Sequence, residues 1–90
     1  ARAVRYIRDK ACEGISTADV LREVAVSRRW LDQKLKQTIG RTCADEIERV
    51  RLEHARSLLV ASDVSLTEVS AAAGFNYLSH FSHAFKRHFG

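Results

Sequence analysis

One pattern occurs twice in this chain, as STADVLREVAVSRRWLDQKLKQTIG at residues 16–40 and as SLTEVSAAAGFNYLSHFSHAFKRHFG at residues 65–90. Each copy has a Ser before a short segment with helical apolar spacing, then a tight turn, a second such segment and a closing Gly. When the second segments are aligned, Gly40 matches Gly90. The pattern predicts a duplicated helix-turn-helix, a unit that carries a helix into the DNA major groove.

The rest of the chain is also predicted to be helical. It has no Pro and four Gly, and its apolar positions keep a helical period from end to end. We expect a first helix over residues 2–13 that stops at Gly14, and a long helix from Thr42 to about Ala61 between the two copies. The sequence therefore predicts an all-α fold, with two helix-turn-helix subdomains joined by a long central helix.

Capping residues predict where the helices begin and end. A Ser, Thr or Asn side chain can accept a hydrogen bond from the first free backbone amides of a helix. The Ser65 cap is expected to form a capping box with Glu68, and Gly40 to end the third helix in a left-handed conformation. The expected N-caps are Ser16 or Thr17, Ser27, Ser65 and Asn76.

The length of the chain predicts one domain with one shared core. Ninety residues with 46% hydrophobic content bury roughly 60% of the unfolded surface, which is too little for two independent cores. The expected division is a single domain over 1–90, with a first unit at 1–41, a connecting helix at 42–62 and a second unit at 63–90. The start at Ala1 and the abrupt end at Gly90 predict a piece of a longer protein, truncated at the C-terminus of its second unit.

The positive charge is concentrated in the first half of the chain. The net charge is +4 and the pI is near 9.5. Residues 1–45 carry ten Lys and Arg against six Asp and Glu, whereas residues 46–90 carry five of each. The excess clusters at Arg28, Arg29, Lys34, Lys36 and Arg41. This distribution favours a polyanionic partner.

Several classes of protein are disfavoured by what the sequence contains. It shows no signal peptide and no apolar run that could span a bilayer, which predicts a cytoplasmic, nucleoid-associated protein without a membrane partner. Cys12 and Cys43 are isolated and belong to no CxxC motif, which favours packing within helices over a disulfide. The thiol of Cys43 opens a helix, where we expect it to ionise somewhat more easily. We expect no cofactor and no metal.

The third helix is predicted to present a polar outer face to a partner. Counted at about 100° per residue from Leu31, three side chains lie opposite the apolar side and two flank them. These are Arg29, Gln33 and Lys36, flanked by Asp32 and Trp30. An Arg side chain can form hydrogen bonds with guanine, a Gln side chain with adenine, and a carboxylate with cytosine. Lys36 and Arg28 are better placed for contacts with phosphates. Any amphipathic helix has a polar face, but the duplicated unit and the charge cluster together favour DNA.

The sixth helix carries less charge on its outer face. The residues opposite Phe81 are Ser79, His83 and Lys86, flanked by Ser82 and His80. Tyr77 and Leu78 begin this helix, where they could either meet thymine methyl groups and sugars or pack inward. We therefore expect weaker base specificity here, or specificity set by DNA shape.

Three stretches resemble a known family. SRRWLDQKLKQTIG at 27–40, RLEHARSLL at 51–59 and LTEVSAAAGFNYLSHFSHAFKRHFG at 66–90 are similar to the helix-turn-helix units and connecting helix of AraC/XylS-type transcriptional regulators. The G-F…F…FK..FG run is a specific signature, and the resemblance covers nearly the whole chain. The opening YIRDKACEGI at 6–15 is similar to the xylose-operon activator branch. Members usually continue past the final Gly into a Pro-containing segment and a last helix, and Leu78 replaces a polar residue common in them.

The resemblance implies two recognition helices, about 28–39 and 77–88, in successive major grooves of double-stranded promoter DNA. It implies base contacts by Arg29, Asp32, Gln33, Leu78, Ser79, His80, Ser82 and His83, and backbone contacts by Trp30, Lys36 and Lys86. It further implies a bacterial regulator, an activator of sugar (xylose-like) catabolism genes that works with RNA polymerase. A small-molecule effector would act through a domain absent from this chain, and a dimer is compatible with the full-length protein.

An enzyme and a protein-interaction module are the alternatives to a DNA-binding domain. We do not expect an enzyme. His80 and His83 have the spacing of paired metal ligands, but two ligands do not make a site. Some DNA-repair methyltransferases carry such a domain beside a reactive Cys, a context that neither Cys has here. A helical protein-interaction module would use the acidic side of the long helix, with Glu46, Glu48 and Glu53.

Overall fold

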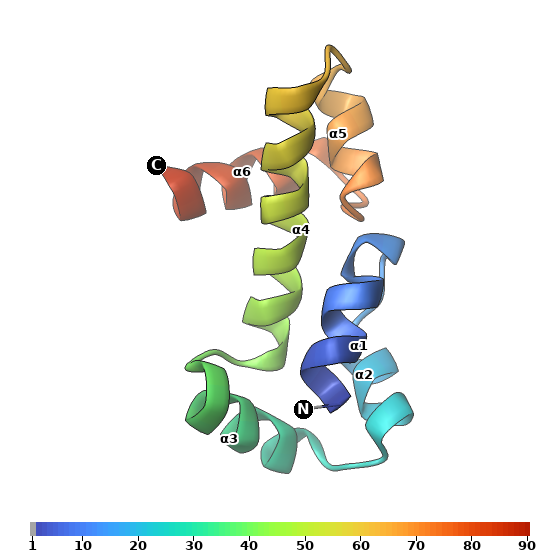
Figure 1. Ribbon diagram of the computed structural model, residues 1–90, viewed down its shortest axis with the longest axis vertical. Helices are drawn as coiled ribbons and strands as arrows, with labels where there is room; N and C mark the ends of the chain where they lie inside the picture. The colour runs from blue at the N-terminus through green and yellow to red at the C-terminus, as the bar shows by residue number, and fades with distance from the viewer. Residues whose placement is uncertain (1) are drawn as a thin grey trace.

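The computed structural model describes residues 2–90, and all of their regular structure is helical (Figure 1). The elements are α1 (Arg2–Lys10), the 3₁₀ helix η1 (Ala11–Glu13), α2 (Thr17–Val24), α3 (Arg28–Ile39), α4 (Cys43–Ala61), α5 (Leu66–Ala72) and α6 (Leu78–Phe89). This confirms the predicted fold class. Within the described range, no helix is both long enough and apolar enough to cross a membrane.

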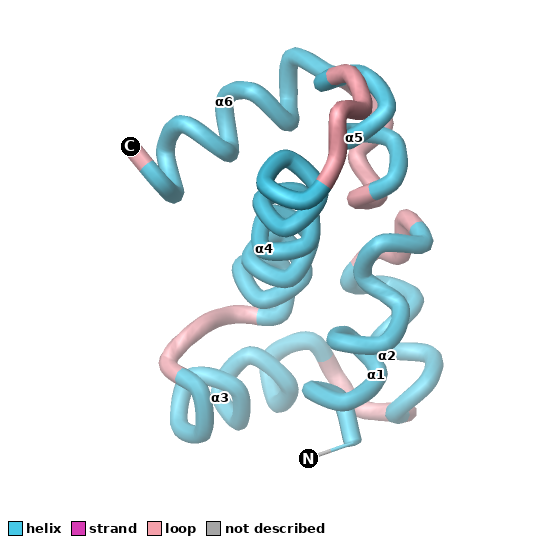
Figure 2. The backbone as a smooth tube through the Cα atoms, turned by 45° about the horizontal axis from the view of Figure 1, so that its top comes forward, coloured by secondary structure: helices cyan, strands magenta, loops and turns pink. Residues whose placement is uncertain are grey.

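The long helix α4 is the axis of the molecule. Its 19 residues correspond to a length of about 28 Å, and the whole structure measures 40 × 23 × 21 Å. In Figures 1 and 2, α1, α2 and α3 lie around the first half of α4, while α5 and α6 lie around its second half. Both views place α3 and α6 on one side of α4, towards its opposite ends, so the two second helices of the helix-turn-helix units are presented together.

The buried side chains form two clusters, and the expectation of one shared core is wrong. The N-terminal core consists of Ile7, Ala11, Val20, Leu31, Leu35, Cys43 and Ile47. The C-terminal core consists of Leu52, Ala55, Val69, Ala73, Phe75, Phe81 and Ala84. The cores are separate because α4 is long enough for each of its ends to be covered by a different set of helices. Both units share α4 as support but not a common interior.

Most of the predicted helix ends are confirmed. Ser16 begins α2 with a complete capping box, in which its hydroxyl accepts from the Asp19 amide and the Asp19 carboxylate accepts from the Ser16 amide. Ser27 begins α3, and Gly40 ends it at φ 73°. Ser65 begins α5 by accepting from the amide of the predicted partner residue three positions on. These ends are determined by neighbours within one turn, which is why the sequence predicts them.

Three local expectations differ from the structure. Helix α1 stops at Lys10 and the chain tightens into η1 before Gly14, so residues 2–13 do not form one α-helix. At Ser65 the hydroxyl accepts from the Glu68 amide, but the second bond of the capping box, from the Ser65 amide to the Glu68 carboxylate, is not formed. The N-cap of α6 is Tyr77, whose backbone is extended and whose side chain makes no capping bond, rather than Asn76.

Glu46 is buried, which contradicts its expected place on an exposed acidic side of α4. Its carboxylate accepts from Arg41 at 2.8 Å and from Arg49 at 2.9 Å, and Arg8 approaches within 3.5 Å. The hydrogen bond from Arg49, with that from Arg41, outweighs burial and lowers the pKa of Glu46 to about 2. Arginines from α1, from the turn between α3 and α4 and from α4 itself therefore surround one carboxylate. Glu48 is engaged as well, by Arg87 of α6 at 2.6 Å, so the acidic surface considered for a protein partner is largely used inside the fold.

Candidate nucleic-acid interface

Helix α3 is held by one side and exposes the other. Leu31 and Leu35 are only 1% and 2% exposed and anchor the helix in the N-terminal core. The hydroxyl of Ser27 accepts from the Trp30 amide at 3.1 Å and fixes the first turn. The exposed side chains of α3 include all of its predicted contact residues except Asp32: Arg28, Arg29, Trp30, Gln33 and Lys36.

The exposed cations of α3 are not neutralised within residues 2–90. Arg28, Arg29, Lys34 and Lys36 form none of the ion pairs found in that range, whereas Arg2, Arg8, Lys10, Arg22, Arg41, Arg49 and Arg87 each pair with a carboxylate. Four unpaired cations on one exposed helix produce a positive surface, and such surfaces attract phosphates.

Asp32 has a structural contact that the sequence did not indicate. Its Oδ1 accepts from the Cys43 amide at 3.0 Å, which ties α3 to the first turn of α4. A carboxylate is favourable at that helix end because of the helix dipole. Cys43 itself lies in the N-terminal core, and burial raises the pKa of its thiol. The expectation that this thiol ionises more easily is therefore wrong, since burial there outweighs its place at the helix start.

Helix α6 is anchored through a row of aromatic rings. Phe75, Phe81, Phe85 and Phe89 follow one another with centroid distances of 5.4, 5.5 and 4.6 Å, and Phe81 is only 2% exposed. The exposed side chains of α6 include four of the predicted contacts, which are Ser79, Ser82, His83 and Lys86.

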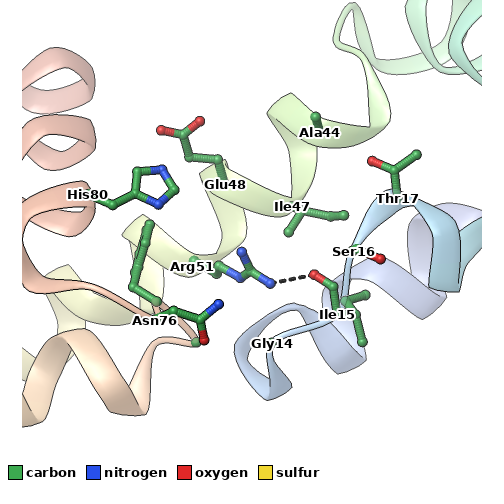
Figure 3. Close-up of a pocket in the computed structure, with 12 residues that line it drawn as sticks. Gly14, Ile15, Ser16, Thr17, Ala44, Ile47, Glu48, Arg51, Asn76 and His80 are labelled. Carbon is green, nitrogen blue, oxygen red and sulfur yellow. Dashed lines mark hydrogen bonds between the residues drawn. The ribbon is translucent and has the colours of Figure 1, made fainter.

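The start of α6 is more exposed than inward packing would allow. Tyr77 is 71% and Leu78 is 41% exposed, which leaves both available to a partner. His80 differs from its neighbours, because its ring packs against Phe75 in a T-shaped arrangement with 5.2 Å between the ring centroids. It also lines a cavity of about 350 Å³ between the two units, beside Glu48 and Arg51 (Figure 3). No group of three side chains suited to a metal ion occurs within residues 2–90.

Sequence reasoning missed Arg51, which lies between the two cores. Its guanidinium donates to the backbone oxygens of Ala11 and Ile15 at 2.7 and 2.5 Å. The sequence contains a sign of this role. Arg51 is four residues from both Ile47 and Ala55, so it lies on the same buried side of α4. A charged residue in the middle of an apolar helix side indicates a fixed partner.

Known proteins with helix-turn-helix domains are similar to this chain. Residues 20–90 match the family described as "Helix-turn-helix domain". The chain is 38% identical over 86 residues to the xylose operon regulatory protein of Escherichia coli (strain K12), a match that covers 96% of this chain and 22% of that protein. It is 37% identical over 87 residues to the "HTH-type transcriptional activator RhaS" of Escherichia fergusonii, covering 97% of this chain and 31% of that protein.

A solved structure is similar to the whole fold. The structure described as that of the xylose-binding transcription activator XylR matches with a TM-score of 0.80 and 38% identity, over 97% of this chain and 23% of that one. The chain thus spans between about a fifth and a third of the length of these relatives.

Proposed function

This chain belongs to the AraC-type helix-turn-helix domain family, and from that premise we propose that it binds double-stranded DNA with α3 and α6 in successive major grooves. The observation that carries the proposal is the set of four exposed cations on α3 that form no ion pair within residues 2–90. Helix α6 supports it, since it lies on the same side of α4. The length of α4, about 28 Å, is enough to hold α3 and α6 apart on the scale of one DNA turn, about 34 Å.

We assign the base contacts to side chains that are exposed and can donate or accept hydrogen bonds. In α3 these are Arg29 and Gln33, with Arg28, Trp30 and Lys36 on the DNA backbone. In α6 they are Ser79, Ser82 and His83, with Leu78 against a base methyl group and Lys86 on the backbone. We assign no base contact to His80 or Asp32, because each already has a partner inside the protein.

The names of the relatives support a role in transcription. One is called an operon regulatory protein and another a transcriptional activator. We propose that this chain is the DNA-binding, non-enzymatic part of a bacterial regulator that acts in the cytoplasm on promoters of sugar catabolism genes, xylose-like ones in particular. In that role RNA polymerase is a partner. A small-molecule effector acts through a separate domain, which also provides any dimer contact.

The proposal is tested by two substitutions on α3 and a control on α1. Arg29→Ala is expected to cost about 1–3 kcal/mol on a selected duplex and to relax the preference at one base pair, because a bidentate base contact is lost. Lys36→Ala should weaken binding to all sequences equally, as expected for a phosphate contact. Arg5→Ala removes the same charge from an exposed position of α1.

Affinities are measured by fluorescence anisotropy on the selected duplex and on its single-base variants, at one salt concentration. An Arg29→Ala protein that behaves like Arg5→Ala at every base pair contradicts the assignment. If both Arg29→Ala and Lys36→Ala bind the duplex as tightly as the parent, α3 is not a recognition helix.

A further inference from the structure

The two units touch each other at a small joint, and Arg51 of α4 lies at its centre. Its guanidinium donates two hydrogen bonds to the N-terminal unit, from Nε to the Ala11 oxygen at 2.7 Å and from an Nη to the Ile15 oxygen at 2.5 Å, the latter drawn as a dashed line in Figure 3. The same guanidinium lies 5.9 Å from the ring centroid of Phe75, in the C-terminal core. One side chain therefore contacts both units.

Gly74 brings the backbones of the two units together at the same joint. It lies in the turn between α5 and α6, and its φ of +96° is one that L side chains rarely adopt. A β-carbon at this position would lie 2.9 Å from the Ala11 oxygen and 3.0 Å from backbone atoms of Cys12. The turn that leads into α6 is thus seated directly on η1, beside the carbonyl group that Arg51 holds.

The other links between the units run through α4, because each core includes side chains of that helix and Arg87 of α6 pairs with Glu48 of α4. The N-terminal and C-terminal cores are separate clusters, so no common interior locks one unit against the other. Helix α4 supports both units, and the joint of Arg51 and Gly74 adds a direct contact between them at one side of that helix. Two charge-assisted hydrogen bonds and an aromatic contact from one planar guanidinium form the Arg51 part of this contact.

We propose that the joint made by Arg51 and Gly74 fixes the angle between α3 and α6 and so selects the spacing between the two DNA half-sites. This inference rests on the proposed DNA-binding function. One added base pair moves a half-site by about 3.4 Å along the axis and by about 35° around it, since a turn holds 10–10.5 base pairs. A rigid pair of recognition helices fits one spacing, whereas a loosened pair tolerates several.

The first test measures the angle without DNA. Arg51→Met keeps the apolar stem of the side chain but removes both hydrogen bonds. Arg56→Met is the matched control, because the Arg56 guanidinium lies 5.2 Å from the Phe89 ring and makes its contact within the C-terminal unit. Residual dipolar couplings of the backbone amides are compared between α2–α3 and α5–α6. We expect one alignment for both units in the parent and in Arg56→Met, and different degrees of alignment in Arg51→Met. One common alignment in all three proteins overturns the proposal.

The second test measures half-site spacing. Duplexes are selected with the parent, and one or two base pairs are then inserted or deleted between the two protected stretches. The parent should prefer the original spacing by about tenfold or more, and Arg51→Met should reduce that preference to about threefold or less, mainly by losing affinity at the original spacing. An unchanged spacing preference in Arg51→Met contradicts the proposal. A parent that binds no duplex overturns the proposed function, while the dipolar couplings still decide whether Arg51 fixes the angle.

Discussion

At the scale of single residues, the two turns of the repeat solve the same backbone problem with different residues. Ala25 follows α2 at φ 54°, and Gly74 follows α5 at φ 96°. The left-handed region costs an L residue roughly 1–2 kcal/mol because its β-carbon crowds the next carbonyl, and Gly avoids that cost. The first turn therefore carries backbone strain that the second does not.

Exchanging these residue types should have opposite effects. Ala25→Gly is expected to raise the free energy of unfolding by about 0.5–1 kcal/mol, since Ala25 is exposed and little packing is lost. Gly74→Ala is expected to lower it by about 2 kcal/mol or more, because it adds both the strain and a 2.9 Å approach to the Ala11 oxygen. Urea denaturation of the two variants and the parent measures both values. Changes of the same sign would contradict the account of these turns.

Glu46 makes stability depend on acid pH. Its pKa is about 2 in the folded protein and near 4.3 in an unfolded chain, so the ionised carboxylate stabilises the fold fully above about pH 5. That contribution, on the order of 3 kcal/mol, is lost as the pH falls towards 2.

We expect Glu46→Gln to be less stable than the parent at pH 7 and the difference to shrink steadily between pH 4.5 and 2. The free energy of unfolding, measured by urea denaturation across this range, gives the difference directly. Glu53→Gln, on the exposed side of the same helix, is the control and should follow the parent. A difference between Glu46→Gln and the parent that stays constant from pH 7 to 2 would show that Glu46 acts without its charge.

At the scale of the elements, the sequence predicts those helix ends that depend only on neighbouring residues. The caps at Ser16, Ser27 and Ser65 and the stop at Gly40 need only partners within one turn, and each is found in the structure. Asn76 is not the cap of α6, because that helix begins one residue later, after Tyr77. The same turn carries Gly74, which lies close to η1, a segment distant in sequence.

For the candidate interface, the sequence predicts which side chains are exposed but not which of them have partners inside the protein. Helical spacing correctly predicted that Arg29, Gln33 and Lys36 of α3 are exposed. The internal contacts of Asp32 and His80 were not predictable, because their partners, Cys43 and Phe75, belong to other segments of the chain. Spacing along one helix gives the direction of a side chain but not what another element places beside it.

The junction of α3 and α4 provides a prediction that separates two roles for Asp32. Asp32→Ala should lower the free energy of unfolding by about 1 kcal/mol, because the Cys43 amide loses its acceptor. The base preference of the selected duplex should stay the same. Gln33→Ala, at the exposed neighbouring position, should have the reverse pattern, with stability within about 0.5 kcal/mol of the parent and an altered preference at one base pair. If Asp32→Ala changes the base preference and leaves stability intact, Asp32 belongs to the reading face.

At the scale of the whole molecule, a single long helix carries two separately packed units. The N-terminal unit contributes the unpaired cations of α3, and the C-terminal unit contributes an exposed face with little charge. Affinity should therefore depend mainly on α3 and decrease steeply with salt as counterions are released from the DNA. Helix α6 should add a second, less charged contact surface, because it lies on the same side of α4 as α3 (Figure 1).

Hydroxyl-radical footprinting of the chain on a selected duplex shows whether both helices enter the DNA together. If they do, two protected stretches are expected about 10 base pairs apart on one face of the duplex. Protection of a single stretch, at protein concentrations that saturate the duplex, would contradict the proposed binding by both helices.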